Sequence, residues 1–65
     1  MKKFVGKIVG HTDQYQVGYE VTVRAHDEDE ARRLFQREIE GAACLYRLLL
    51  KACCVNLWLE SFWPL

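Results

Sequence analysis

A strict alternation of apolar and polar residues runs from Tyr15 to Ala25, and it constrains the fold more than any other feature. The apolar set occupies every second position: Val17, Tyr19, Val21, Val23 and Ala25. The positions between them are polar or glycine. A period of two is typical of a β-strand with one buried face. The chain must therefore supply a second layer to cover that face.

The segment before this strand predicts a partner for it. Lys3–Val9 is rich in β-branched and aromatic residues, which favour a strand. Residues 10–14 are polar and have the length of a hairpin loop. We expect a β-hairpin over residues 3–25, with bulge or turn roles for its glycines, Gly6, Gly10 and Gly18.

After the hairpin the spacing of apolar residues changes to that of a helix. Asp27 as the N-cap residue, with Glu30 three positions later, is the aspartate form of a capping box. An apolar stripe at 3–4 spacing predicts an amphipathic helix: Ala31, Leu34, Phe35, Ile39 and Ala42. Gly41 either ends this helix or lies inside it, since the stripe continues through Tyr46, Leu49 and Cys53.

The C-terminal third differs in composition from the rest of the chain. Residues 42–65 contain 18 hydrophobic residues out of 24, against 15 of 41 before them. Val55, Leu57 and Leu59 alternate with more polar neighbours and predict a third strand of about six residues. A second helix is the alternative, and residues 63–65 are expected to be a terminal stub.

The expected fold class is therefore α+β: an N-terminal hairpin on a central helix, followed by a strand (ββαβ) or a second helix (ββαα). The helix is expected to pack on the apolar face of the hairpin. We interpret residues 1–65 as one small domain, with residues 1–41 as hairpin plus helix and residues 42–65 as a hydrophobic segment.

Charge and length exclude several function classes. The 65 residues carry 9 basic and 9 acidic side chains, which argues against a binder that neutralises nucleic-acid phosphates. A nucleic-acid-binding hairpin remains an alternative, because four basic residues accompany Tyr15 and Tyr19 there: Lys2, Lys3, Lys7 and Arg24. A chain of this size is also too small for a multidomain enzyme.

The cysteines and histidines form no recognisable chemical motif. Three cysteines, Cys44, Cys53 and Cys54, are a poor disulfide framework, and we interpret them as buried free thiols in a reducing, cytoplasmic setting. No ligand pairs with metal-site spacing occur among them and His11 and His26. We predict no catalytic residue, no metal and no cofactor, and hence a non-enzymatic protein.

The aromatic residues near the C-terminus exceed what a small monomer can bury. Trp58, Phe62 and Trp63 are the predicted partner-binding residues, for a host protein or for self-association. The acidic helix start, Asp27, Glu28 and Asp29, is a second candidate contact. A membrane-associated protein anchored by residues 42–65 is the competing interpretation, although Arg47, Lys51 and Glu60 interrupt that segment.

One segment carries a resemblance to known proteins. The junction Tyr19-Glu20-Val21-Thr22-Val23-Arg24-Ala25-His26-Asp27-Glu28-Asp29-Glu30-Ala31-Arg32, within residues 15–40, is similar to small phage- and plasmid-encoded ββαβ proteins. These include DpnD/PcfM-like accessory proteins and short phage inhibitors of bacterial RNA polymerase. The resemblance implies an accessory protein that modulates a host protein by occlusion, and it assigns no functional residue.

Overall fold

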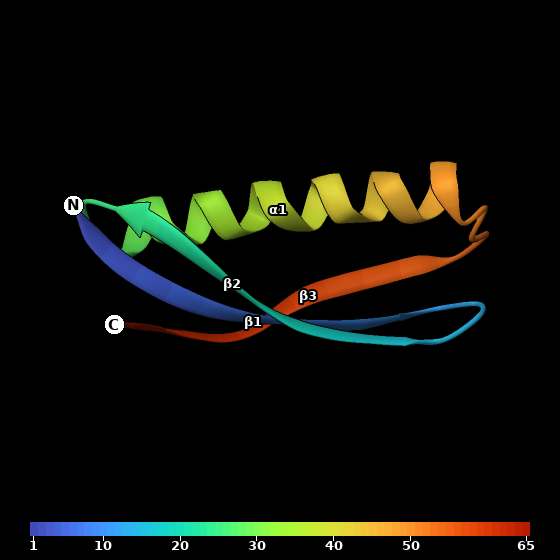
Figure 1. Ribbon diagram of the computed structural model, residues 1–65, viewed down its shortest axis with the longest axis horizontal. Coiled ribbons are helices and arrows are strands. Elements are labelled where there is room, and N and C mark those ends of the chain that lie inside the picture. The colour runs from blue at the N-terminus through green and yellow to red at the C-terminus, as the bar shows by residue number, and fades with distance from the viewer.

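The computed structural model describes all residues 1–65 and has the element order ββαβ. Its elements are β1 (Lys2–Thr12), β2 (Gln16–Ala25), α1 (Glu28–Leu49) and β3 (Val55–Pro64). The strands form one antiparallel sheet in the order β2-β1-β3, so β1 lies in the middle (Figure 1). The first of the two expected folds is thus confirmed, with a third strand instead of a second helix.

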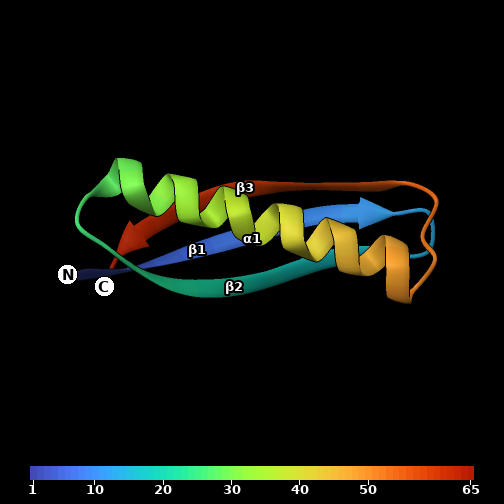
Figure 2. The same ribbon diagram turned by 90° about the horizontal axis from the view of Figure 1, so that it is seen from above.

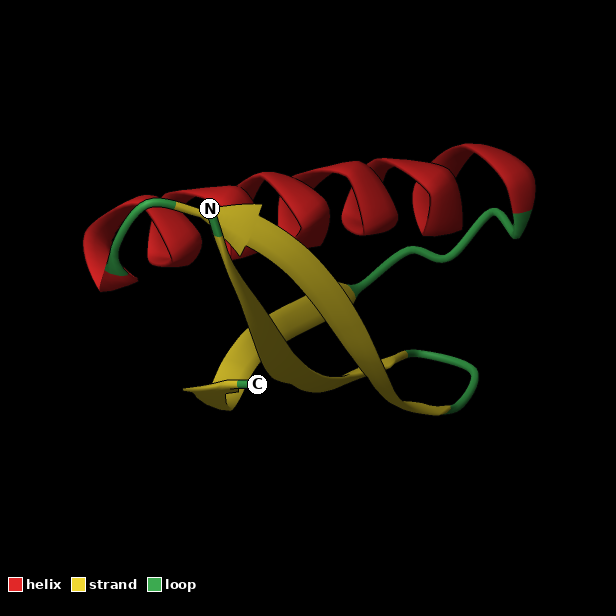
Figure 3. Ribbon diagram, turned by 60° about the vertical axis from the view of Figure 1, so that its left-hand side comes forward, coloured by secondary structure: helices red, strands yellow, loops and turns green.

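The molecule has two layers, the sheet and α1. A helix of 22 residues at 1.5 Å per residue is about 33 Å long, which matches the 36 Å length of the molecule. The helix lies along one face of the sheet, and no element covers the other face (Figure 3). Seen from above, α1 crosses the sheet diagonally, and its C-terminal end reaches the outer side of β2 (Figure 2).

The hairpin is confirmed, but its strands are longer than expected. The predicted loop over residues 10–14 is wrong at its start, because Gly10–Thr12 continue β1. Gly10 and His11 pair with both neighbouring strands, and Thr12 pairs with Val55 of β3. Only Asp13, Gln14 and Tyr15 connect the strands. The hydroxyl oxygen of the buried Thr12 accepts hydrogen bonds from the Gln14 and Tyr15 backbone N–H groups, at 3.0 and 3.1 Å.

Two glycines of β1 allow neighbouring groups to lie close to the strand backbone, and they do not have the expected role in a bulge or turn. A Cβ atom at Gly6 would lie 2.6 Å from the Phe35 ring, so the glycine makes room for that ring under α1. A Cβ atom at Gly10 would collide with the backbone of Asn56 and Leu57 in β3. Both positions therefore exclude side chains on steric grounds alone.

The helix begins as the capping pattern predicts. The Asp27 carboxylate accepts a hydrogen bond from the Glu30 N–H at 2.8 Å. In a complete capping box Glu30 would accept from Asp27 in return. Here its carboxylate accepts from the His26 N–H at 3.0 Å, one residue further out.

The helix ends well beyond Gly41, which lies in its interior. The last turn is closed by Leu50 and Ala52, whose N–H groups both donate to the Tyr46 carbonyl oxygen at 3.2 Å. Lys51 between them has a φ of 54°, in the left-handed region that favours glycine.

The core lies between β1 and the first half of α1. Its buried centre consists of Phe4, Ala25, Ala31 and Phe35. Phe62 and Leu59 of β3 pack against it beside Val21 and Val23 of β2. The helix therefore rests on all three strands and not on the hairpin alone, because the third strand completes the sheet on the other side of β1.

The hydrophobic C-terminal segment is not one structural unit. Residues 42–49 finish α1, residues 50–54 form a linker, and Val55–Pro64 form β3. The expected stub over residues 63–65 is wrong, because Trp63 and Pro64 pair with Val5 and Phe4. Pro64 fits there since it stands at the end of an edge strand, where no ladder donor is needed.

Candidate functional site

A β-bulge in β3 decides which aromatic side chains reach the surface. Lys7 pairs with Ser61 and Ile8 with Leu59, so Glu60 is an extra residue in β3. In a regular strand Trp58 and Trp63 would point to opposite faces, because five positions separate them. The extra residue brings both tryptophans to the face that carries no helix.

The two tryptophans lie directly opposite valines of the central strand. The register pairs Trp58 with Val9 and Trp63 with Val5. Val5 is buried, whereas Trp58 and Trp63 remain 46% and 38% exposed. We call these four residues (Val5, Val9, Trp58 and Trp63) the tryptophan face. It combines sheet-stabilising cross-strand pairs with aromatic surface that nothing in the chain covers.

Charged residues separate the two tryptophan–valine pairs. Lys7 lies between them, directly opposite Glu20 of β2 in the register. Its ammonium group lies 3.6 Å from a Glu60 carboxylate oxygen. Because one cation faces two acids, this row adds no positive charge to the tryptophan face.

His11 extends the aromatic surface at one end. Its ring meets the Trp58 ring edge-on, with 6.3 Å between the ring centroids. Across the sheet, a Cβ atom at Gly18 would meet nothing within 4 Å. Gly18 pairs with Val9, so the sheet surface is left open beside that valine.

Phe62, the third predicted aromatic contact, is on the other side of the sheet. Its ring packs against Phe35 and Phe4, with centroid distances of 5.5 and 6.3 Å. The Arg32 guanidinium covers it, 5.0 Å from the ring centroid. The structure thus places Trp58 and Trp63 on the same face of the sheet and assigns Phe62 to the packing beneath α1.

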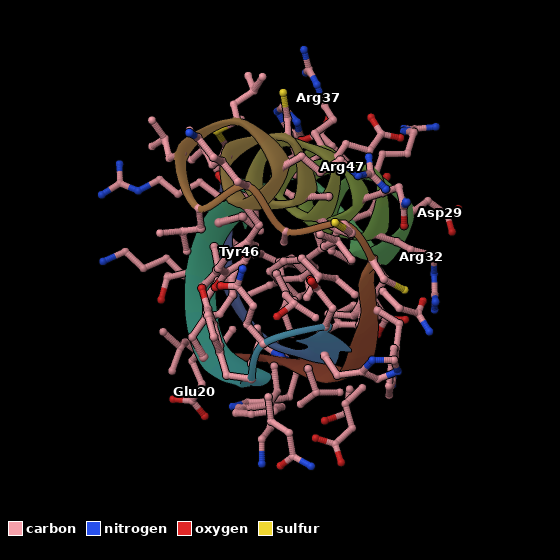
Figure 4. The ribbon with its side chains drawn as sticks, turned by 90° about the vertical axis from the view of Figure 1, so that its right-hand side faces the viewer. Glu20, Asp29, Arg32, Arg37, Tyr46 and Arg47 are labelled. Atoms are coloured by element: carbon pink, nitrogen blue, oxygen red, sulfur yellow. The ribbon has the colours of Figure 1, made fainter.

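The acidic helix start lies apart from the tryptophan face. Asp27 is occupied as the N-cap, and Glu28 and Asp29 are exposed in the first turn. Viewed along the helix, Asp29 lies on the β3 side of α1 near Arg32, whereas Glu20 projects on the far side of the sheet (Figure 4).

The prediction of buried cysteines is wrong. Cys44, Cys53 and Cys54 are all free and exposed. Cys44 points outward from the helix, and the other two lie in the linker, whose backbone is held by Asp13. That carboxylate accepts from the Cys53 and Cys54 N–H groups at 3.0 and 3.4 Å. No three His, Cys, Asp or Glu side chains gather closely enough to hold a metal ion.

Sequence reasoning also missed the surface at the C-terminal end of α1. Leu49 was expected on the buried stripe, but it is 72% exposed, and its neighbours Leu45, Leu48 and Leu50 are also exposed. The helix passes beyond β2 here, so the sheet offers these side chains little to pack on (Figure 2). The signal was the leucine run itself, which is too dense for one helical stripe.

A shallow apolar hollow lies between this helix end and β2. Six side chains line it: Tyr19, Ala42, Leu45, Tyr46, Leu49 and Leu50. Tyr46 points toward β2 (Figure 4). Partial burial, reinforced by Tyr46 and Glu38, raises the pKa of Tyr19 above its usual value. Tyr19 therefore stays neutral around pH 7.

Comparisons with known proteins bring no relative. No family model, no curated protein and no solved structure matches the chain. No helix in the chain combines the length and the apolar character needed to cross a bilayer.

Proposed function

We propose that the chain is a small, non-enzymatic protein-binding module that covers part of its partner through the tryptophan face. The observation that carries the proposal is the placement of Trp58 and Trp63, both partly exposed on the one sheet face without a helix. Partly exposed tryptophans on a rigid sheet are the usual anchors of protein interfaces.

The charge pattern supports a protein surface as the partner. Lys7 is offset by Glu20 and Glu60 within the tryptophan face. An apolar patch with a balanced polar row suits a mixed protein surface better than a polyanion. Occlusion of a host protein, as the resemblance of residues 15–40 implies, is the mode of action we propose.

Selection of short peptides from a displayed random library would test this. We expect selected peptides to shift the indole N–H resonances of both tryptophans and to lose binding at least tenfold with Trp58→Thr plus Trp63→Thr. Threonine keeps strand propensity while removing the aromatic surface. Leu48→Ser, which alters another exposed apolar residue, is the matched control and should leave binding unchanged. Peptides that bind the double variant equally well would contradict the proposal.

A second candidate, single-stranded nucleic acid, is favoured by one observation. The same face carries the edge-to-face pair of His11 and Trp58 rings, with Lys3 and Arg24 at its other end. Bases stack on such aromatic side chains beside basic residues. Titration with a uridine oligonucleotide decides: salt-dependent quenching of tryptophan fluorescence supports this candidate, and unchanged fluorescence supports the protein partner.

A further inference from the structure

The leucine-rich end of α1 forms a second unpartnered surface, remote from the tryptophan face. Leu45, Leu48, Leu49 and Leu50 are 57%, 71%, 72% and 46% exposed. Together they expose on the order of 400 Å² of apolar area, within the size range of patches that mark interaction sites. Leu45 and Leu49 line the apolar hollow between the helix end and Tyr19 of β2.

Glu38, Gly41 and Leu45 share this flank of the helix. They are spaced at three and four residues and line one hollow with Tyr19. A Cβ atom at Gly41 would meet nothing within 4 Å, so the glycine leaves a gap of one side chain in the flank. A gap of this kind between exposed leucines can receive a leucine from another helix.

We propose that two copies of the chain pair through this flank, with their α1 helices antiparallel and the two-fold axis at Leu45. In that arrangement Leu45 packs on its own copy. Leu49 of each chain lies opposite Gly41 of the second copy and fills the gap. Because the contact is two-fold, each of these contacts occurs twice.

Charge complementarity supports a second copy as the occupant. With the axis at Leu45, Lys51, two residues beyond the end of one helix, lies near Glu38 of the other helix. Both side chains are exposed, and neither has an ion-pair partner within its own chain. The antiparallel pair thus brings two unpaired cations to two unpaired carboxylates.

The area that the two copies bury indicates how strongly the dimer should form. Two flanks of this size bury at most about 800–1,000 Å² in total, below the usual range of stable interfaces and in the range of weak, transient ones. We therefore expect a weak dimer that forms at tens to hundreds of micromolar. Sedimentation velocity from roughly 5 to 500 µM should show a monomer giving way to a dimer.

The substitution Gly41→Leu tests dimer formation without disturbing the fold of the monomer. A Cβ atom added at this position meets nothing within one chain, and leucine favours a helix more than glycine does, so the thermal midpoint of the monomer should not fall. The leucine side chain nevertheless fills the gap that Leu49 needs. We expect dimer affinity to fall at least tenfold. A dimer unaffected by Gly41→Leu would overturn the proposed geometry.

Charge swaps test the register. Glu38→Lys and Lys51→Glu should each weaken pairing several-fold, and the double variant should restore it. Glu40→Lys, the same change on another side of the helix, is the matched control and should have no effect. Failure of the double variant to recover would contradict the antiparallel alignment.

Cross-linking tests the axis directly. In a background with the three natural cysteines changed to serine, Leu45→Cys should form an intermolecular disulfide on oxidation. Gln36→Cys, on the opposite side of the helix, should not. A chain that stays monomeric throughout, or that instead floats with vesicles of anionic phospholipid, would overturn the proposal and, in the second case, assign the leucines to a lipid surface.

Discussion

The two ends of this molecule hold the same helix to the same sheet by different means. At the end with the chain termini, three phenylalanine rings fill the space between the layers, with Phe35 fully buried. At the other end, hydrogen bonds join the β1–β2 loop to the linker, and the leucines of α1 stay exposed. The comparison separates an end stabilised by packed aromatic rings from one where hydrogen bonds accompany a smaller buried apolar set, Val17 and Ala52.

The largest expected effect lies at the phenylalanine end. Phe35→Ala should lower the free energy of unfolding by about 3–5 kcal/mol, because it leaves a cavity over Gly6 that the rigid sheet cannot fill. Leu48→Ala at the other end should change it by less than about 0.5 kcal/mol. Urea denaturation of both variants checks the contrast, and equal effects would mean that both ends pack alike.

The next effect concerns the polar end. Asp13→Ala removes the acceptor for the Cys53 and Cys54 N–H groups and should cost about 1 kcal/mol. Hydrogen exchange of these two amides should speed up, while the amides around Phe35 keep their protection. Uniform loss of protection would show that the two ends are not independent.

Gly41→Ala should act in the opposite direction. This position is helical and exposed, and an added methyl group meets nothing. Alanine should therefore stabilise the monomer by about 0.5–1 kcal/mol through helix propensity. Thermal unfolding at low micromolar concentration, where the proposed dimer is absent, gives the measurement, and a destabilised variant would contradict an open flank.

The smallest expected effect is the dependence of stability on pH. The pKa of Tyr19 is raised in the folded chain, so between its unfolded and folded values the folded state binds more protons. The contribution of Tyr19 to stability should therefore be fully present below about pH 10 and be lost as the pH rises further. Tyr19→Phe should flatten this decline in urea midpoints measured from pH 8 to 11, and an unchanged slope would contradict it.

Periodicity predicted the parts of the fold in which every residue follows one rule. Burial along β2 follows the alternation from Val17 to Ala25, and Asp27 caps the helix as its sequence indicates. Periodicity could not reveal the extra residue at Glu60, because the bulge depends on how β3 fits β1 and not on β3 alone. The grouping of Phe62 with the tryptophans rests on aromatic content alone, and content does not show that Phe62 packs against Phe4 and Phe35 beneath the helix.

The exposed leucines and cysteines escaped prediction for a related reason. A helical stripe shows which residues share one side, but not where the sheet beneath the helix ends. Because α1 crosses the sheet diagonally, the stripe leaves the sheet before the helix ends (Figure 2). Leu49 and Cys53 therefore continue the apolar spacing of the stripe in the sequence, but both side chains are exposed because the core does not extend to them.

The central place of β1 has a consequence for how the chain folds. The hairpin and the helix form from residues that are close in the sequence. The second edge of β1 pairs with β3, the strand furthest from it in the sequence, and stays unpaired until β3 has formed. Closing that long loop is slow relative to local contacts. Until β3 arrives, β1 offers a free row of backbone donors and acceptors beside Phe4 and Ile8, and this edge is where we expect nascent chains to capture one another.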